Sequence, residues 1–443
     1  MNETLRQVVG RARALLNDKL VGKIVRNSGV ILSGNLASSA LGFVSFAIVA
    51  HSLGPELLAY FALAQVYALI INDLFNVQTW ECLIKFGARD DRSHDLGCTV
   101  KTNVIIDLAS ALLAFGVAFG FADRIGAHLG WDDTLIRLAR FYSFVIPFTL
   151  TTLTVGIPRL YDKFAVIAKI QFAMAIVKLL LIATVKFRGG GVLEFTSVYI
   201  LVDILINFSL IVVSLRLAKR ENLVDWIRTK VRLTREEVRF LWWTNLRTVV
   251  RIPVRQLDLL IMNQVLSMNV VGIYKSYKEM VGVIGRLGDP INQALYPEYA
   301  KLIGSDRISD SLSVTRKITW ILFTASVATL IGYLVASRFV IGTFFGAEYL
   351  AYMPAFYLLV VLFCINLFLT PVHSLFIAAG FARYSFYIVL GNNILYLAVA
   401  MVGSVYLGIY GLILAFASQM TFNQGLKVYY LRKHSTGWQT VIR

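Results

Sequence analysis

The chain has 443 residues, of which 57% are apolar and 16% are charged, and its mean hydropathy is +0.68. Soluble domains usually carry about 25% charged residues, so this composition excludes a soluble enzyme and a disordered protein. Lysine and arginine exceed aspartate and glutamate by 17. On so apolar a chain this excess indicates a cytoplasmic membrane face, and no nucleic-acid partner is expected. The three cysteines are too few and too widely spaced for a disulfide framework or a zinc site.

Residues 1–26 carry six lysines and arginines, with leucines and valines recurring near helical spacing. No long apolar core follows a short basic start, so the segment does not resemble a secretory signal peptide. We expect a basic amphipathic helix on the cytoplasmic membrane surface, and a mobile basic tail is the alternative.

Twelve stretches are long and apolar enough to cross a bilayer, which takes about 20 residues. Glycine-containing turn signals separate most of them. Their approximate bounds are 27–50, 57–84, 100–122, 138–157, 164–187, 192–215, 240–265, 270–297, 318–341, 353–380, 384–407 and 409–431.

The basic residues between the spans test this count. With twelve spans, 30 lysines and arginines fall on one side of the membrane and 6 on the other. The positive-inside rule then places both termini in the cytoplasm. One missed or invented helix would destroy this asymmetry.

The sequence also predicts two halves. A basic linker, 218–239, separates a six-helix lobe at 27–217 from a second at 240–431, and a cytoplasmic tail follows at 432–443. Residues 53–61 align weakly with 266–274, each after the first helix of its half. The expected fold is therefore an all-α integral membrane protein with parallel repeats around a central cavity that opens by rocking. Chance similarity between apolar segments is the alternative.

Once the 30 and the 6 have been assigned to the two sides of the membrane, seven basic residues are left inside the predicted spans. On a regular helix, Arg247, Arg251, Arg255 and Asp258 share one narrow stripe. Each charge facing lipid would cost about 2.5–3.5 kcal/mol or more, so the stripe should face the protein interior or a wet cavity. The other four are Lys178, Lys275, Lys278 and Arg286.

Two interpretations of these charges remain open. In the first, the seven basic residues line a lumen that binds an anion, because guanidinium groups bind phosphate oxygens in pairs. In the second, they form structural ion pairs between helices. The acids that could serve as counter-ions or couple transport to an ion are Asp73, Glu81, Asp107, Asp203, Asp258, Glu279 and Asp289, with Lys275 and Glu279 four residues apart.

Several short motifs resemble the polysaccharide flippases of the multidrug/oligosaccharidyl-lipid/polysaccharide (MOP) exporter superfamily. They are Leu53-Gly54-Pro55-Glu56, Leu295-Tyr296-Pro297-Glu298-Tyr299-Ala300-Lys301-Leu302, Phe345-Gly346-Ala347-Glu348-Tyr349 and Tyr410-Gly411. The resemblance covers residues 25–431 and implies a flippase for O-antigen or exopolysaccharide repeat units. Its cargo would be a polyprenyl-pyrophosphate-linked oligosaccharide, moved through membrane lipid beside other polysaccharide-assembly membrane proteins.

Three other functions compete with this one. A drug or cation exporter of the same fold would need acids in its cavity, whereas the second half is biased towards basic residues. The relative that flips the peptidoglycan precursor usually has fourteen spans. An enzyme of lipid-linked glycan assembly usually has a large outer loop, whereas the longest here is 123–137. Neither a phosphate-binding loop nor a metal-binding motif occurs, so no cofactor or metal is expected.

Overall fold

The computed structural model describes residues 19–87, 96–220, 229–250, 252, 256–305 and 307–434, and every regular element in these ranges is helical. The chain forms two compact units. One contains Ala40–Gly272, and the other contains Ile273–Arg443 together with the segment that ends at Ser39. Most of the predicted N-terminal amphipathic segment, Arg251, Arg255, part of the basic linker and the end of the tail lie outside the described residues.

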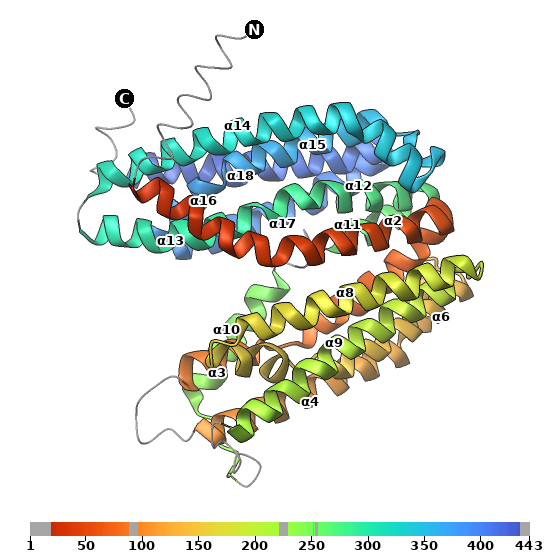
Figure 1. Cartoon of the computed structure of the whole chain (residues 1–443), viewed down its shortest axis with the longest axis horizontal. Helices are drawn as coiled ribbons and strands as arrows, with labels where there is room; N and C mark the ends of the chain where they lie inside the picture. The colour runs from red at the N-terminus through yellow and green to blue at the C-terminus, as the bar shows by residue number, and fades with distance from the viewer. Residues whose placement is uncertain are drawn as a thin grey trace. The chain divides into compact units, whose positions relative to one another are not determined.

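The unit Ala40–Gly272 combines a few long helices with several short ones. The pair α8 and α9 pack along each other after a tight glycine turn (Figure 1, yellow and yellow-green). The helices are α2 (Lys19–Phe75, which begins in the other unit), α3 (Thr79–Gly87), α4 (Leu96–Gly120), α5 (Ala122–His128), α6 (Asp133–Tyr142), η1 (Ser143–Phe148), η2 (Thr152–Gly156), α7 (Ile157–Leu160), α8 (Phe164–Phe187), α9 (Val192–Arg220), α10 (Arg235–Val249) and α11 (Asp258–Val265).

The second unit has its core where α13, α14 and α16 meet, around the buried side chains of Tyr299 and Phe376. Helices α17 and α18 pack closely because Gly403 faces Gly411, where an added Cβ would lie 2.0 Å from backbone. The helices are α12 (Met268–Arg286), α13 (Gly288–Gly304), α14 (Ile308–Val340), η5 (Ile341–Phe345), η6 (Ala347–Leu350), α15 (Met353–Phe368), α16 (Thr370–Ala378), α17 (Ala382–Leu407) and α18 (Ile409–His434).

Seven continuous helical stretches of the described chain are long and apolar enough to cross a membrane. An eighth is a pair bent by 57°, Asp133–Phe148 with Thr152–Leu160. The stretch Ala37–Gly87 has 51 residues and holds the first two predicted spans, since Gly54 breaks the helix with a φ of 70° before Pro55. The remaining predicted spans correspond to α10–α11, α12–α13 and α18, which are shorter or more polar.

Helix α10 belongs by its contacts to the first unit, where it packs against α3. Its start is fixed by a capping box, in which the Thr234 hydroxyl accepts from the Glu237 amide and the Glu237 carboxylate accepts from the Thr234 amide. Just before it, the Thr229 carbonyl accepts a 2.8 Å hydrogen bond from Lys101 Nζ on α4. The lobe boundaries at 217 and 240 stay a prediction.

Candidate functional site

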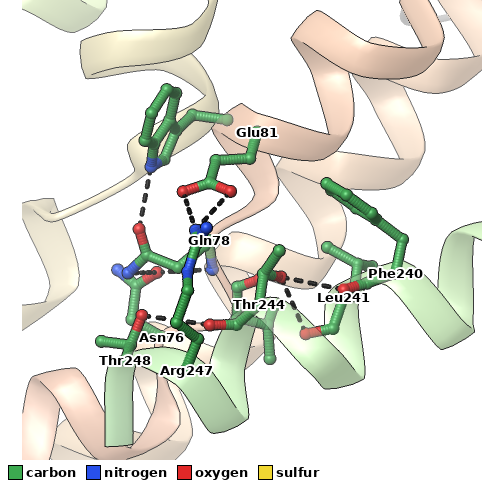
Figure 2. A network of polar contacts seen from close by, with 10 residues as sticks. Asn76, Gln78, Glu81, Phe240, Leu241, Thr244, Arg247 and Thr248 are labelled. Carbon is green, nitrogen blue, oxygen red and sulfur yellow. Dashed lines mark hydrogen bonds and ion pairs between the residues drawn. The ribbon is translucent and has the colours of Figure 1, made fainter. Parts of the chain in front are cut away.

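The backbone is broken between α2 and α3, at residues 76–78. Gln78 has a φ of 55°, and its backbone N–H donates a hydrogen bond to Asn76 Oδ1 at 3.0 Å. A break at membrane depth frees carbonyl groups, and each unsatisfied one costs several kcal/mol in lipid. Asn245 of α10 donates through Nδ2 to the Leu74 and Asn76 carbonyls at 3.3 and 3.0 Å (Figure 2 draws Asn76 beside α10). The break is therefore capped by a side chain of another helix.

A buried carboxylate supports the other side of the break. Asp107 of α4 is 2% exposed and accepts hydrogen bonds from the Thr79 hydroxyl, the Thr151 hydroxyl at 3.2 Å and the Thr152 amide at 2.6 Å. Thr79 begins α3 and Thr152 begins η2. One side chain thus holds two helix starts together, as N-capping carboxylates do within a single helix.

A cavity of about 220 Å³ opens beside the break. Arg247 of α10 contacts both carboxylate oxygens of Glu81 of α3 through Nη2, with 2.6 Å to Oε2 (Figure 2). The Arg247 side chain is 47% exposed and that of Glu81 is 20% exposed. The cavity is lined by Asp73, Gln78, Trp80, Glu81, Arg247, Thr248 and Ile252.

The aromatic side chain of this cavity is held from two directions. Trp80 Nε1 donates to Gln78 Oε1 at 2.8 Å, and the Arg159 guanidinium carbon lies 4.6 Å from the centroid of the indole ring. A cation over an aromatic face is attracted by the ring quadrupole. Next to them, Asp73 Oδ2 accepts from Gln256 Nε2 at 3.2 Å. The site therefore combines a fixed aromatic ring, an amide, two carboxylates and one guanidinium.

The predicted arginine stripe is described only in part. Arg247 lies at the cavity, whereas Arg251 and Arg255 lie outside the described residues. Helix α10 ends at Val249, and α11 begins only at Asp258 after a π-helical turn. Asp258 is fully buried, and its Oδ1 accepts from the Leu259 amide at 3.0 Å. Because residues 251 and 253–255 lie outside the described residues, the shared stripe stays a prediction.

Lys178 and Asp203 come together in the same unit, away from this cavity. Lys178 Nζ of α8 lies 3.3 Å from the centroid of the Tyr199 ring and interacts electrostatically with Asp203 of α9. Asp203 Oδ2 also accepts from the Tyr142 hydroxyl at 2.7 Å, and that hydroxyl accepts from Gln65 Nε2 at 3.0 Å. These contacts resemble the structural alternative for buried charges, in which each charge has partners.

The basic residues of the eighth predicted span lie on α12 in the other unit. Lys275 Nζ donates to Glu279 Oε1 at 2.8 Å, which confirms the expected pairing. Arg286 Nη2 lies 3.6 Å from Glu279 Oε2, and Lys278 is on the same helix. Asp289 falls in α13, and its side chain lies outside the described ones.

Four lining residues of the cavity, Gln78, Trp80, Thr248 and Ile252, were not predicted to belong to a site, and neither was the pairing of Glu81 with Arg247. The polar run Asn76-Val77-Gln78-Thr79 inside an apolar span was the available signal, since it interrupts a stretch that otherwise reads as one helix. No cluster of potential metal ligands occurs among the described residues.

The fold matches that of known transporters. An inward-facing multidrug-resistance transporter of the MATE family, in the MOP superfamily, superposes with a TM-score of 0.75 at 15% identity, covering 92% of this chain and 96% of that one. The lipid II flippase MurJ, in an inward closed conformation, gives a TM-score of 0.68 at 15% identity and covers 93% and 90%. These matches confirm the predicted all-α, twelve-span fold, so the chain is a multi-pass membrane protein of the MOP transporter fold.

The sequence comparisons name the family. The family described as "Polysaccharide biosynthesis protein" matches residues 24–303, more than half of the chain, and this protein belongs to it. The inner membrane protein YghQ of Escherichia coli strain K12 is 26% identical over 148 residues, which are 33% of this chain and 42% of that protein. The matched region thus spans less than half of that relative. The resemblance to the MOP superfamily is confirmed.

Proposed function

We propose that this protein is a flippase that moves polyprenyl-pyrophosphate-linked oligosaccharides, such as O-antigen or exopolysaccharide repeat units, from the cytoplasmic to the outer leaflet of a bacterial inner membrane. Membership of a polysaccharide biosynthesis family and the MOP transporter fold support a glycan cargo. The protein acts as a transporter rather than an enzyme, with both termini in the cytoplasm. The predicted lobes 27–217 and 240–431 rock to expose the cargo on either side.

The observation that carries this proposal is that the Arg247 guanidinium is only partly engaged by Glu81. Both of its hydrogen bonds to Glu81 use Nη2. A guanidinium has five N–H donors, so the donors on Nε and Nη1 have no partner among the described residues, and the side chain lines a cavity. Glu81 holds the group in place, and a pyrophosphate binds the remaining donors with charge-assisted hydrogen bonds.

The other predicted basic residues extend this binding function. Arg251 and Arg255 follow Arg247 in the chain, and Asp258 pairs with one of them between transport events. Lys275, Lys278 and Arg286 contribute positive charge from α12, with Glu279 on the same helix and Asp289 on α13 as counter-ions. The polyprenyl tail stays in lipid, because each of its buried methylene groups is stabilised there by about 0.8 kcal/mol.

The test is lipid analysis of a strain that lacks this gene and makes such a glycan. Accumulation of a complete lipid-linked repeat unit is expected, measured by mass spectrometry of extracted lipids. Wild type and Arg239→Ala, an exposed arginine at the start of the same helix, should clear the accumulated lipid. Arg247→Ala and Arg255→Ala should not, at equal protein levels in the membrane. Unchanged lipid intermediates in the deletion strain would contradict the proposal.

One observation favours a second function, export of an organic cation. The cavity carries two carboxylates, Asp73 and Glu81, against one described arginine. A cation exporter needs such acids, and the superposed MATE protein is a multidrug resistance transporter. Loss of resistance to cationic dyes in the deletion strain, restored by wild type but not by Asp73→Asn, would favour this function over glycan transport.

A further inference from the structure

We infer that the cavity beside the α2–α3 break is a sugar subsite, which binds the single sugar ring next to the pyrophosphate, with Trp80 as its stacking surface. This inference rests on the proposed function, because the sugar is that of the lipid-linked cargo. It goes beyond that function by assigning the ring to named side chains of one unit.

The size of the cavity sets what it can hold. A water molecule takes about 30 Å³ of liquid volume, so about 220 Å³ corresponds to roughly seven waters. That space fits one sugar ring and not a branched oligosaccharide. The rest of a repeat unit must therefore lie outside this cavity, and only one ring can be selected by it.

The lining residues suit a ring with hydroxyl groups. Pockets for drug-like molecules are lined mostly by apolar and aromatic side chains. Among the described lining residues, Trp80 and Ile252 are apolar, and the others are acids, an amide, a hydroxyl and a guanidinium. Sugar rings present apolar C–H faces and polar edges. The indole face of Trp80 can pack against the C–H face of the ring, and the carboxylate of Asp73 can accept a hydrogen bond from a hydroxyl at its edge.

The ring of Trp80 is positioned before any ligand arrives. The indole N–H donates a hydrogen bond to Gln78, and Arg159 lies over the ring. The Trp80 side chain also lines the cavity. Gln78 is itself fixed in a left-handed backbone conformation by Asn76. A strained residue that is held by its surroundings is typical of binding sites. Preorganisation of this kind raises affinity because little side-chain freedom is lost on binding.

The position of Arg247 determines which sugar of the cargo the subsite binds. Arg247 lines the same cavity as Trp80, and its side chain is 47% exposed, so a phosphate can bind it at the open edge while the cavity holds the ring. A ligand that places phosphate on Arg247 therefore places the directly attached group, rather than a distal one, against the indole. The subsite thus recognises the sugar that is linked to the pyrophosphate.

The experiment measures binding to the full-length protein in lipid nanodiscs by microscale thermophoresis. The probes are farnesyl pyrophosphate and its conjugates with single hexoses and N-acetylhexosamines. In the wild type, at least one conjugate should bind about tenfold more tightly than farnesyl pyrophosphate itself. Trp80→Ala and Asp73→Asn should reduce this ratio to below threefold, and Trp80→Phe should keep most of it. Trp242→Ala changes an exposed tryptophan of α10 outside the cavity and should leave the ratio unchanged.

The results separate the two proposals. If farnesyl pyrophosphate binds and Arg247→Ala weakens it, but no sugar improves binding, the sugar subsite is wrong and the phosphate site stands. An unchanged ratio in Trp80→Ala overturns the subsite as well. If farnesyl pyrophosphate does not bind the wild type at all, the proposed function fails. Binding of farnesyl pyrophosphate by each variant also shows that the variant is folded.

Discussion

Two groups of charges in this protein are built in different ways. At the α2–α3 break, Glu81 and Arg247 come from different helices and meet beside a cavity. On α12, Lys275, Glu279 and Arg286 lie along a single helix. An ion pair between helices fixes where two backbones lie, whereas a pair within one helix neutralises charge without fixing a neighbour. Substitutions in the first group should therefore have effects that depend on side-chain geometry, whereas the effects of substitutions in the second should depend on charge alone.

The largest effect should come from the buried support of the break. Asp107→Ala leaves the two threonine hydroxyls and the Thr152 amide without their acceptor. At about 1–3 kcal/mol per buried unsatisfied group, we expect a loss of about 3 kcal/mol in the free energy of unfolding, measured in detergent. Asp123→Ala, which removes an exposed surface pair with Arg140, should change it by less than about 0.5 kcal/mol. Equal stability of both variants would show that the break does not depend on Asp107.

The cap from α10 should matter somewhat less. Asn245→Ala removes the donor shared by the Leu74 and Asn76 carbonyls. The expected loss in the same unfolding measurement is about 2 kcal/mol. Asn245→Asp keeps the size but replaces the amide with a carboxylate that cannot donate and repels the carbonyls. If Asn245→Asp is as stable as the wild type, the proposed capping is wrong.

Exchanging the two kinds of cation tests the comparison directly. Arg247→Lys keeps the charge but loses the planar fork, so the rate of glycan-lipid transport should fall about tenfold. Lys275→Arg keeps charge on α12 and should lower the rate less than twofold. Rates are compared at equal protein levels in proteoliposomes. Equal effects of both exchanges would remove the distinction between geometry and charge.

The smallest expected effects are the coupling energies of the two pairs. A double-mutant cycle on Lys275 and Glu279 should give about 0.3–0.5 kcal/mol, as for other pairs four residues apart on a helix. A cycle on Glu81 and Arg247 should give up to about 1 kcal/mol, since the arginine is half exposed and solvent screens the pair. A larger coupling on α12 than across the break would reverse the comparison.

Much of the fold could be predicted from the sequence because spans and basic loops obey simple rules. Gly54-Pro55 and the glycine turn at 189–191 mark real helix ends. The pairing of Lys275 with Glu279 could be predicted because residues four positions apart on a helix are neighbours. The partner of Arg247 could not be predicted, because Glu81 is 166 positions away and meets it only through the fold. The alignment of Arg251 and Arg255 with Arg247 stays a prediction, since it was derived from the angle per residue of an unbroken helix.

The central claim is that this protein moves a pyrophosphate-linked glycan lipid across a bilayer and that Arg247 binds its phosphates. The most direct test is translocation of a short-chain polyprenyl-pyrophosphate oligosaccharide in proteoliposomes, followed by the accessibility of its sugar to external periodate. The wild type should transport the lipid well above empty vesicles, and Arg247→Ala should remain near their level. A wild type no faster than empty vesicles, or an Arg247→Ala variant as fast as the wild type, would contradict the account.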